Sequence, residues 1–256
     1  MRYLAVVLSA SVAALSSGVA FAAAEHSGHE PHWSYTGGDT GPESWGKLKP
    51  EFATCSAGKE QSPININKAL SANLQKIEFS YKDSPLEVVN NGHTIQANYK
   101  AGSTITVNGK TFELAQFHFH APSEHTVEGK AYPMEAHFVH KNAQGELAVV
   151  GVFLEKGETN PALTPVWNNM PKEANHNAKL EQAFNAKNLL PQEAAYYHYK
   201  GSLTTPPCAE SVDWYVLKNP VKMSEEQVKA FNSVVKANAR PVQPSNRRFI
   251  LADDGN

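Results

Sequence analysis

The sequence predicts a β-dominated α+β fold, a single domain built on a large, mainly antiparallel, twisted central β-sheet with a few short peripheral helices. Three observations support this prediction. Short runs of alternating apolar and polar residues fill most of residues 77–154, Asn-Gly turn signals separate several of these runs, and only one segment has a complete helix signature. The 256 residues, 41% of them hydrophobic, are enough for one sizeable core, although length alone also permits two small domains.

The first 22 residues have the features of a secretory signal peptide. Arg2 precedes an apolar stretch from Leu4 to Leu15, and small residues follow, so we expect cleavage between positions 20 and 24. A membrane anchor is the alternative, but serines and a glycine interrupt the stretch before it reaches the roughly 20 apolar residues of a spanning helix. We therefore expect a periplasmic domain of residues 23–256 with no membrane attachment.

The charge of the chain bears on its possible partners, and its cysteine content bears on a disulfide bond. The formal net charge is −2, and no basic run is present that would recruit nucleic acid or anionic lipid. Cys55 and Cys208 are the only cysteines, and in an oxidising compartment such a pair indicates one disulfide bond. The bond would close a long loop, from residue 55 to residue 208. In the chain-entropy model, closing a loop of this length stabilises the folded protein by about 5 kcal/mol. A metal role is less favoured, because neither cysteine lies in a Cys-x-x-Cys spacing.

After the leader, residues 25–63 are rich in Gly, Pro, Ser and His and have little periodicity. We expect an irregular segment that wraps over the domain. His26, His29 and His32 offer a possible metal site near the new N-terminus, and a mobile polar tract is the alternative.

The sheet should contain nine strands from the alternating runs. Asn91-Gly92, Asn108-Gly109 and Gln144-Gly145 mark turns between them, and the two Asn-Gly pairs are strong hairpin signals. The expected strands are residues 77–81, 86–89, 94–99, 104–107, 112–120, 134–140, 147–154, 195–199 and 212–217.

One helix has a complete signature near the end of the chain. Ser224 is the expected N-cap, Gln227 completes a capping box, and the helix should end before Pro241. Its apolar face consists of Val228, Phe231 and Val235. Shorter helices are expected near residues 160–168 and 180–186.

Two histidines lie two residues apart in the expected strand 112–120. Side chains alternate across a strand, so His118 and His120 share one face, and His137 in the next strand offers a third imidazole. Three neutral imidazoles with one open position describe a catalytic zinc centre. Gln116 and Glu135 each precede a histidine by two residues and can accept the N–H of a metal-bound imidazole. Hydrogen-bonded structural histidines beside an ordinary polar pair are the alternative.

The same segments resemble those of the alpha-class carbonic anhydrases, and in particular their secreted bacterial branch. The resemblance spans about residues 32–250 in family order. Ala121-Pro122 departs from the Trp-Gly of many animal members and leaves the shape of that loop open. The matching segments are Gln61–Ile66, Asn90–His93, Gln116–His120, Pro122–Val127, Glu135–His140, Gly201–Cys208, Trp214 and Asn238–Pro244.

The resemblance implies the same fold and a zinc enzyme that interconverts CO2 and bicarbonate. Carbonic anhydrase is also the standard example of a zinc ion that lowers the pKa of its bound water to about 7. Thr204 then accepts a hydrogen bond from the hydroxide and donates its own to Glu124, and His93 is the proton shuttle. The implied Zn2+ ligands are His118, His120 and His137, with water or hydroxide in the fourth position.

Further residues take supporting roles in this resemblance. Thr205 is expected to line the same active-site cavity as Thr204. Cys55 and Cys208 match the disulfide bond of the bacterial branch. Resemblance to that branch also implies a homodimer. An apolar wall for CO2 is assigned to Val139, Val149, Leu203 and Trp214, for which core packing is the alternative. Tyr35, Asn91 and Gln96 match the residues that organise the connecting waters.

Two other functions remain open at the level of sequence. A carbonic-anhydrase-like fold can serve as a non-catalytic binding protein when a metal ligand is lost. The presence of all three histidines, Thr204 and Glu124 argues against this alternative. Zinc buffering through the N-terminal histidines predicts zinc uptake without turnover.

Overall fold

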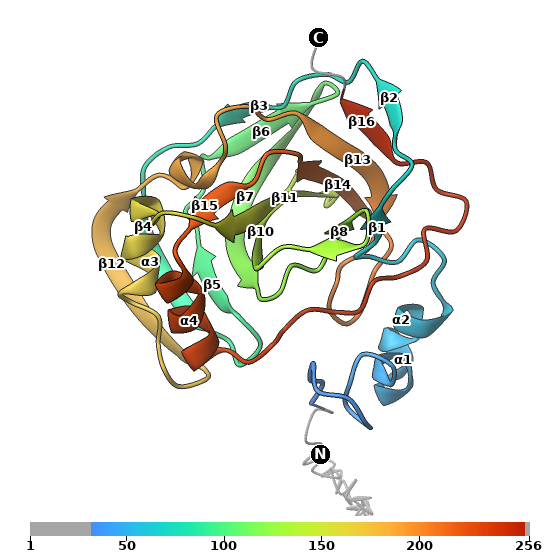
Figure 1. Ribbon diagram of the computed structural model, residues 1–256, viewed down its shortest axis with the longest axis horizontal. Coiled ribbons are helices and arrows are strands. Elements are labelled where there is room, and N and C mark those ends of the chain that lie inside the picture. Colours follow the sequence, from blue (N-terminus) through green and yellow to red (C-terminus); the bar gives the residue numbers. More distant parts are fainter. Residues whose placement is uncertain (1–31, 254–256) are drawn as a thin grey trace, which may run out of the picture. The chain divides into compact units, whose positions relative to one another are not determined.

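A computed structural model describes residues 32–253 (Figure 1). The expected signal peptide, His26 and His29 lie outside the described residues. Within the described residues, one 13-stranded sheet and one 3-stranded sheet form the framework. The large sheet contains β2 (Leu70–Ala72), β3 (Glu78–Ser80), β4 (Ser84–Asn90), β5 (Ile95–Asn98), β6 (Thr104–Val107), β7 (Lys110–His120), β10 (Met134–Lys141), β11 (Leu147–Lys156), β12 (His176–Phe184), β13 (Tyr196–Gly201), β14 (Val212–Leu217), β15 (Val221–Met223) and β16 (Leu251–Asp253).

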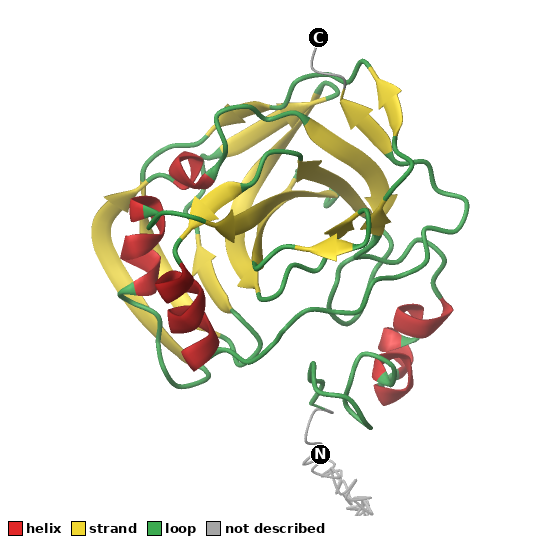
Figure 2. Ribbon diagram, in the orientation of Figure 1, coloured by secondary structure: helices red, strands yellow, loops and turns green. Residues whose placement is uncertain are grey.

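The remaining elements are short. Figure 2 shows that helices are few beside the strands. The small sheet contains β1 (Asn65–Ile66), β8 (Thr126–Val127) and β9 (Lys130–Ala131), and the helices are α1 (Trp45–Leu48), η1 (Pro50–Phe52), α2 (Thr54–Ala57), η2 (Pro161–Leu163), α3 (Thr164–Trp167), η3 (Ala186–Leu189) and α4 (Glu225–Val234). No helix between residues 32 and 253 is long and apolar enough to cross a membrane.

The order of the large sheet is β12-β4-β5-β7-β10-β11-β14-β13-β16-β2, with β15 beside β11 and β6 between β7 and β3. Neighbouring strands are antiparallel except in the pairs β11–β14, β11–β15 and β16–β2. The predicted fold class is therefore confirmed. At the β6–β7 hairpin, Asn108 and Gly109 both have positive φ, as the expected two-residue turn requires.

Each expected strand is present, with ends that differ by at most a few residues. The capping box of α4 is also confirmed, because the side chains of Ser224 and Gln227 each accept a hydrogen bond from the other's backbone N–H. The short helices expected near residues 160–168 correspond to η2 and α3.

The helix expected near residues 180–186 is wrong, because this segment lies mostly in strand β12. Ala, Lys, Leu, Glu and Gln favour a helix when considered alone, but β12 pairs with β4 over residues 176–180 and at Phe184. Tertiary pairing overrides the local preference. The segment 25–63 is likewise less irregular than expected, because its described part contains α1, η1 and α2.

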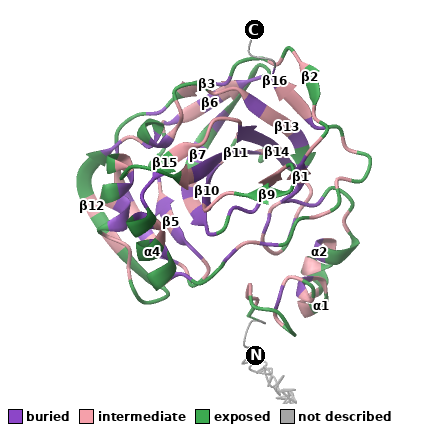
Figure 3. Ribbon diagram, viewed as in Figure 1, coloured by how far each residue is buried: buried purple, intermediate pink, exposed green. Residues whose placement is uncertain are grey.

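The core lies against the face of β7 opposite the two histidines. Phe117 and Phe119 are fully buried, and the Phe117 ring stacks on Phe138 of β10 with centroids 5.4 Å apart. Trp167 of α3 and Phe231 of α4 close this face over Phe119. Figure 3 shows that the central strands are largely buried, whereas β12 is largely exposed. The packed rings fix β7 and thereby the direction of His118 and His120.

Candidate metal centre

Three histidines converge where β7 and β10 pair. His118 and His120 point from β7, and His137 of β10 is directly opposite His118 in the antiparallel register. One ring nitrogen from each histidine lies within 4.8 Å of the other two. The pairing of two neighbouring strands thus assembles the three imidazoles.

Each imidazole also has a polar partner on the side away from the cluster. His118 Nδ1 lies 2.9 Å from Gln116 Oε1, and His137 Nε2 lies 3.0 Å from Glu135 Oε1. His120 Nδ1 lies 2.8 Å from the carbonyl oxygen of Asn238. Gln116 and the Asn238 carbonyl each accept a hydrogen bond from an imidazole, and the Glu135 carboxylate contacts His137. Groups in such positions orient the other ring nitrogen toward a metal.

Two buried ring nitrogens of the cluster, His120 Nε2 and His137 Nε2, have no hydrogen-bond partner among the described residues. His137 Nε2 still contacts the Glu135 carboxylate, whereas His120 Nε2 faces the other imidazoles and is the atom that a metal ion would satisfy. An unsatisfied buried polar atom costs roughly 1–3 kcal/mol, so native proteins seldom retain one without a use. A tetrahedral metal ion that accepts this lone pair removes the penalty, and the three-imidazole donor set suits Zn2+.

Burial keeps the cluster in its metal-binding protonation state. It lowers the pKa of His118 well below its ordinary value and that of His120 to about 4. The pKa of His137 is also lowered by burial, although Glu135 opposes the shift. All three rings are therefore neutral at pH 7, as metal coordination requires.

Glu135 is buried and ionised. Burial raises its pKa, but electrostatic interactions with His125 and His137 outweigh that effect, and the pKa lies well below the usual range. Its Oε1 contacts His125 Nδ1 at 2.8 Å, and its Oε2 accepts hydrogen bonds from the backbone N–H groups of Glu124 and His125. The carboxylate has room because the residue that faces it, Gly151, has no side chain. A Cβ atom at position 151 would lie only 2.9 Å from Glu135 Oε1.

A chain of hydrogen bonds continues from Glu135 into the loop at residues 202–208. His125 Nε2 lies 2.6 Å from the Tyr199 hydroxyl, which donates to Ser62 Oγ at 2.8 Å. Ser62 Oγ accepts from the backbone N–H of Ser202 at 3.0 Å. One continuous buried network therefore links Glu135, which contacts His137, to the loop that carries Thr204.

Glu124 and Thr204 form a second buried polar pair. Glu124 Oε2 lies 3.4 Å from His120 Nε2, and Glu124 Oε1 accepts a 2.8 Å hydrogen bond from the Arg240 backbone N–H. Burial raises the pKa of Glu124 to about 7, while His137 and hydrogen bonds from Thr204 and Arg240 oppose the shift. This carboxylate can accept the hydroxyl proton of Thr204 in a hydrogen bond.

The expected apolar wall belongs to one hydrophobic cluster beside His137. Trp214 contacts His137 with ring centroids 4.9 Å apart, and its Nε1 donates to the Ser202 carbonyl at 3.0 Å. Val149 is buried in the same cluster, and Val139 and Leu203 pack against it while partly exposed. These side chains offer an apolar surface next to the metal centre.

His93 packs against aromatic residues near the N-terminal end of the described chain. Its ring stacks on Trp33 at 3.6 Å and on His32 at 5.4 Å between centroids. Burial, together with His32, lowers the pKa of His93 to about 4. That value is well below the 6.5 that favours a neutral-pH proton shuttle. His93 and His32 line a cavity of about 350 Å³.

The residues expected to organise the connecting waters, and Thr205, have defined surroundings. Asn91 Oδ1 accepts hydrogen bonds from the backbone N–H groups of His93 and Thr94, and Gln96 Nε2 donates to Asn98 at 2.7 Å. The pKa of Tyr35 is raised well above its ordinary value by burial and by Glu124. The Thr205 carbonyl accepts from the Cys208 backbone N–H at 2.8 Å.

A disulfide bond joins Cys55 of α2 to Cys208. Both cysteines pack with Trp45, which is fully buried, and Tyr35 lies against the same cluster. The bond therefore ties the loop of Thr204 to the N-terminal helices.

Sequence reasoning missed three supporting residues. Asn238 accepts from His120 through its backbone carbonyl and donates from its side chain to the His93 carbonyl at 3.1 Å. His125 and Arg240 orient the two buried carboxylates, Glu135 and Glu124, respectively. No spacing rule connects Asn238 to a histidine 118 positions earlier, and the roles of His125 and Arg240 depend on contacts that only the fold creates.

The chain is similar to known proteins of one family. Residues 40–254 match the family model described as eukaryotic-type carbonic anhydrase. The carbonic anhydrase of Neisseria gonorrhoeae is 50% identical over 234 residues, which cover 91% of this chain and 92% of that protein. The alpha-carbonic anhydrase of Thermovibrio ammonificans, solved with the inhibitor sulfanilamide, is 49% identical with a TM-score of 0.84, covering 86% of this chain and 99% of that one.

A third similar protein is a hyperthermostable carbonic anhydrase identified from an active hydrothermal vent chimney. It is 49% identical with a TM-score of 0.85, and the match covers 87% of this chain and all of that chain.

Proposed function

Because the chain belongs to the eukaryotic-type, or alpha, carbonic anhydrase family of enzymes, we propose that it hydrates CO2 reversibly to bicarbonate and a proton with Zn2+ as its cofactor. The observation that carries the proposal is the cluster of His118, His120 and His137, in which the buried His120 Nε2 has no hydrogen-bond partner among the described residues. These three side chains would hold the ion. A bound zinc ion lowers the pKa of a coordinated water to about 7, so that hydroxide is available near neutral pH.

Thr204 and Glu124 orient the nucleophile in this proposal. Glu124, in its ionised form, accepts the hydroxyl proton of Thr204 in a hydrogen bond. The Thr204 oxygen can then only accept a hydrogen bond from the nucleophile, which directs an oxygen lone pair toward the carbon of CO2. Arg240 supports this arrangement by holding the other oxygen of Glu124.

Substrate binding is assigned to the apolar surface beside His137. CO2 has no net dipole and gains little from polar contacts, so Val139, Val149, Leu203 and Trp214 suit it. We propose that Thr205 lines the substrate cavity beside this apolar surface. Bicarbonate is the charged product and leaves toward water.

Proton export is assigned to His93, with Tyr35, Asn91 and Gln96 organising the connecting waters. In its stacked position His93 has a pKa of about 4, so accepting a proton from a group with a pKa near 7 is uphill there. Each unit of that difference costs about 1.4 kcal/mol. We therefore propose that soluble buffer carries a substantial share of the protons.

A stopped-flow assay of CO2 hydration tests the function. The zinc-loaded protein should give a rate well above that of buffer, a chelator should abolish the rate, and added Zn2+ should restore it. A zinc-loaded protein with no rate above buffer contradicts the proposal.

The cellular location and assembly are also proposals. A disulfide bond persists in oxidising compartments, which supports a periplasmic protein released by cleavage of residues 1–22. Cell fractionation followed by N-terminal sequencing tests this, and retention of Met1 would contradict it. We propose a homodimer for the mature chain, and light scattering that gives the mass of one chain would refute it.

A further inference from the structure

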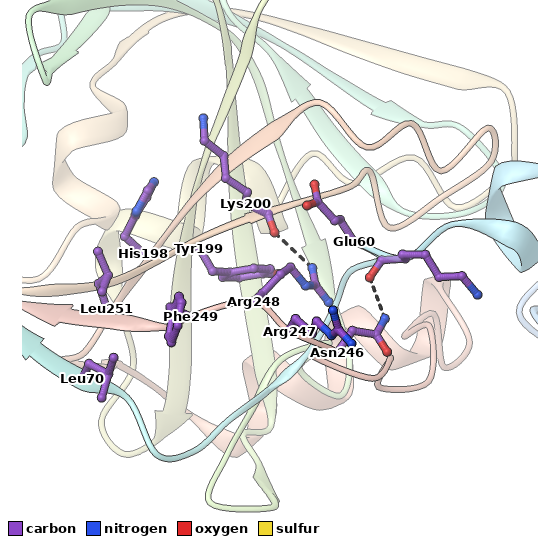
Figure 4. Close-up of a pocket in the computed structure, with 11 residues that line it drawn as sticks. Glu60, Leu70, His198, Tyr199, Lys200, Asn246, Arg247, Arg248, Phe249 and Leu251 are labelled. Carbon is purple, nitrogen blue, oxygen red and sulfur yellow. Dashed lines mark hydrogen bonds between the residues drawn. The ribbon is translucent and has the colours of Figure 1, made fainter.

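A cavity of about 870 Å³ lies between strands β2, β13 and β16 and the loop at residues 246–249 (Figure 4). None of its lining residues is one of the three clustered histidines, Glu124 or Thr204. Its volume is within the 300–1,000 Å³ typical of sites for small molecules. The proposed reaction does not use this cavity.

One part of the cavity is an apolar surface. Phe249 is 73% exposed and Leu70 is 50% exposed, and the only other large hydrophobic side chain exposed among the described residues is Val242. Leu251 and the ring of Tyr199 extend this surface into the cavity. Two large exposed side chains that gather in one hollow are typical of a binding site rather than of scattered surface residues.

The rim beside the apolar surface is positively charged. Arg247 and Lys59 are exposed and have no carboxylate partner among residues 32–253. Arg248 is held by the carbonyl oxygens of Gln61 and Pro244, at 2.8 and 2.9 Å, rather than by a carboxylate. Glu60 is the one acidic side chain in the lining. The excess of positive charge occurs on a chain whose net charge is −2.

This charge pattern discriminates between occupants. A second copy docked by a two-fold axis would place the same cations against each other, which costs free energy. An anion is favoured by the unpaired guanidinium and ammonium groups. We propose that the cavity binds a small organic anion that has an apolar body, with its acidic group at Arg247 and Lys59 and its body on Phe249 and Leu70.

A fluorescence titration with 8-anilinonaphthalene-1-sulfonate, which combines a sulfonate with an aromatic body, tests the proposal on the zinc-loaded protein. We expect saturable binding that weakens at least fivefold in Arg247→Gln and in Phe249→Ser. Val242→Ser is the matched control, because Val242 is exposed but does not line the cavity. The control should bind like the parent, and all three variants should keep the parent rate of CO2 hydration.

Two results would overturn the proposal. Equal dissociation constants for Phe249→Ser, Arg247→Gln and Val242→Ser would show that the probe does not bind in the cavity. Loss of binding when zinc is removed would place the probe at the metal centre. Because the readout is binding of the probe, the outcome does not depend on whether the protein hydrates CO2.

Discussion

His118, His120 and His137 differ from the other buried histidines in having one ring nitrogen that faces the cluster. His140 is only three residues beyond His137, but its Nε2 lies 2.7 Å from the Tyr81 hydroxyl and its Nδ1 lies 3.2 Å from the Ala148 carbonyl. Both nitrogens of His140 are therefore satisfied by protein groups. These partners distinguish the structural His140 from His137, a proposed metal ligand on the same strand.

Substitution of one cluster histidine should remove metal and activity together. His118→Ala leaves only two imidazoles, and we expect loss of stoichiometric zinc and a fall in CO2 hydration of more than a hundredfold. Metal analysis and stopped-flow rates check this. His140→Gln is the control on the neighbouring strand and should retain zinc, so equal zinc loss in the two variants would contradict the assignment.

His93 should affect turnover without affecting zinc. We expect His93→Ala to retain zinc and to lower turnover severalfold in dilute buffer, because proton export then relies on fewer acceptors. Since burial holds the pKa of His93 to about 4, the parent rate should itself increase with buffer concentration at pH 7. A parent rate that is independent of buffer, or zinc loss in the variant, would refute this role.

His140 predicts a pH dependence of folding stability. Burial lowers its pKa to about 4, against an ordinary value of 6.5, so the folded protein favours the neutral ring. The resulting stability is fully present above pH 6.5 and is lost as the pH falls from 6.5 to 4, by about 2 kcal/mol at pH 5.

Urea unfolding of the zinc-free protein at pH 7 and pH 5 measures this effect. The parent should lose about 2 kcal/mol more than His140→Gln on acidification, because the other histidines contribute equally to both proteins. Identical pH dependence in the two proteins would show that His140 already titrates normally in the folded state.

At the scale of elements, the pairing of β10 with β11 brings Gly151 opposite His137. Gly151→Ala adds a Cβ that comes within 2.9 Å of Glu135 Oε1, so the carboxylate must shift from His137. We expect zinc affinity to decrease by roughly 10–100-fold, the usual effect of disturbing a residue that orients a metal ligand. Competition with a metal indicator measures it. Gly37→Ala controls for a general effect of an added methyl group, because its added Cβ comes no closer than 3.3 Å to the Glu43 side chain and its backbone needs no positive φ.

The two strands that carry the clustered histidines were predictable because the residues of each alternate clearly, and Asn-Gly pairs marked turns at β4–β5 and β6–β7 in the same sheet. The Asn108-Gly109 hairpin is an example in which local turn chemistry and the tertiary structure agree. Strand β12 was not predictable, because its residues favour a helix and only pairing with β4 makes them extended. The acceptor for His120 was also beyond sequence reasoning, since any residue can supply a backbone carbonyl.

At the scale of the whole molecule, the Cys55–Cys208 disulfide bond closes a sequence separation of 153 residues. Removing both cysteines with Cys55→Ser and Cys208→Ser should lower the free energy of unfolding by about 2–5 kcal/mol. Because Cys208 lies near Thr204, the turnover number should also fall while zinc is retained. Urea unfolding and metal analysis check both parts, and a variant as stable as the parent would contradict the first.

The position of His137 opposite His118 also bears on the order of events during folding. A slip of one residue between β7 and β10 would turn every side chain of one strand to the other face and separate the imidazoles. If these histidines hold zinc as proposed, the chain can bind it tightly only once the two strands have reached their native register. The rate of tight zinc uptake during refolding would then report when β7 and β10 pair in their native register.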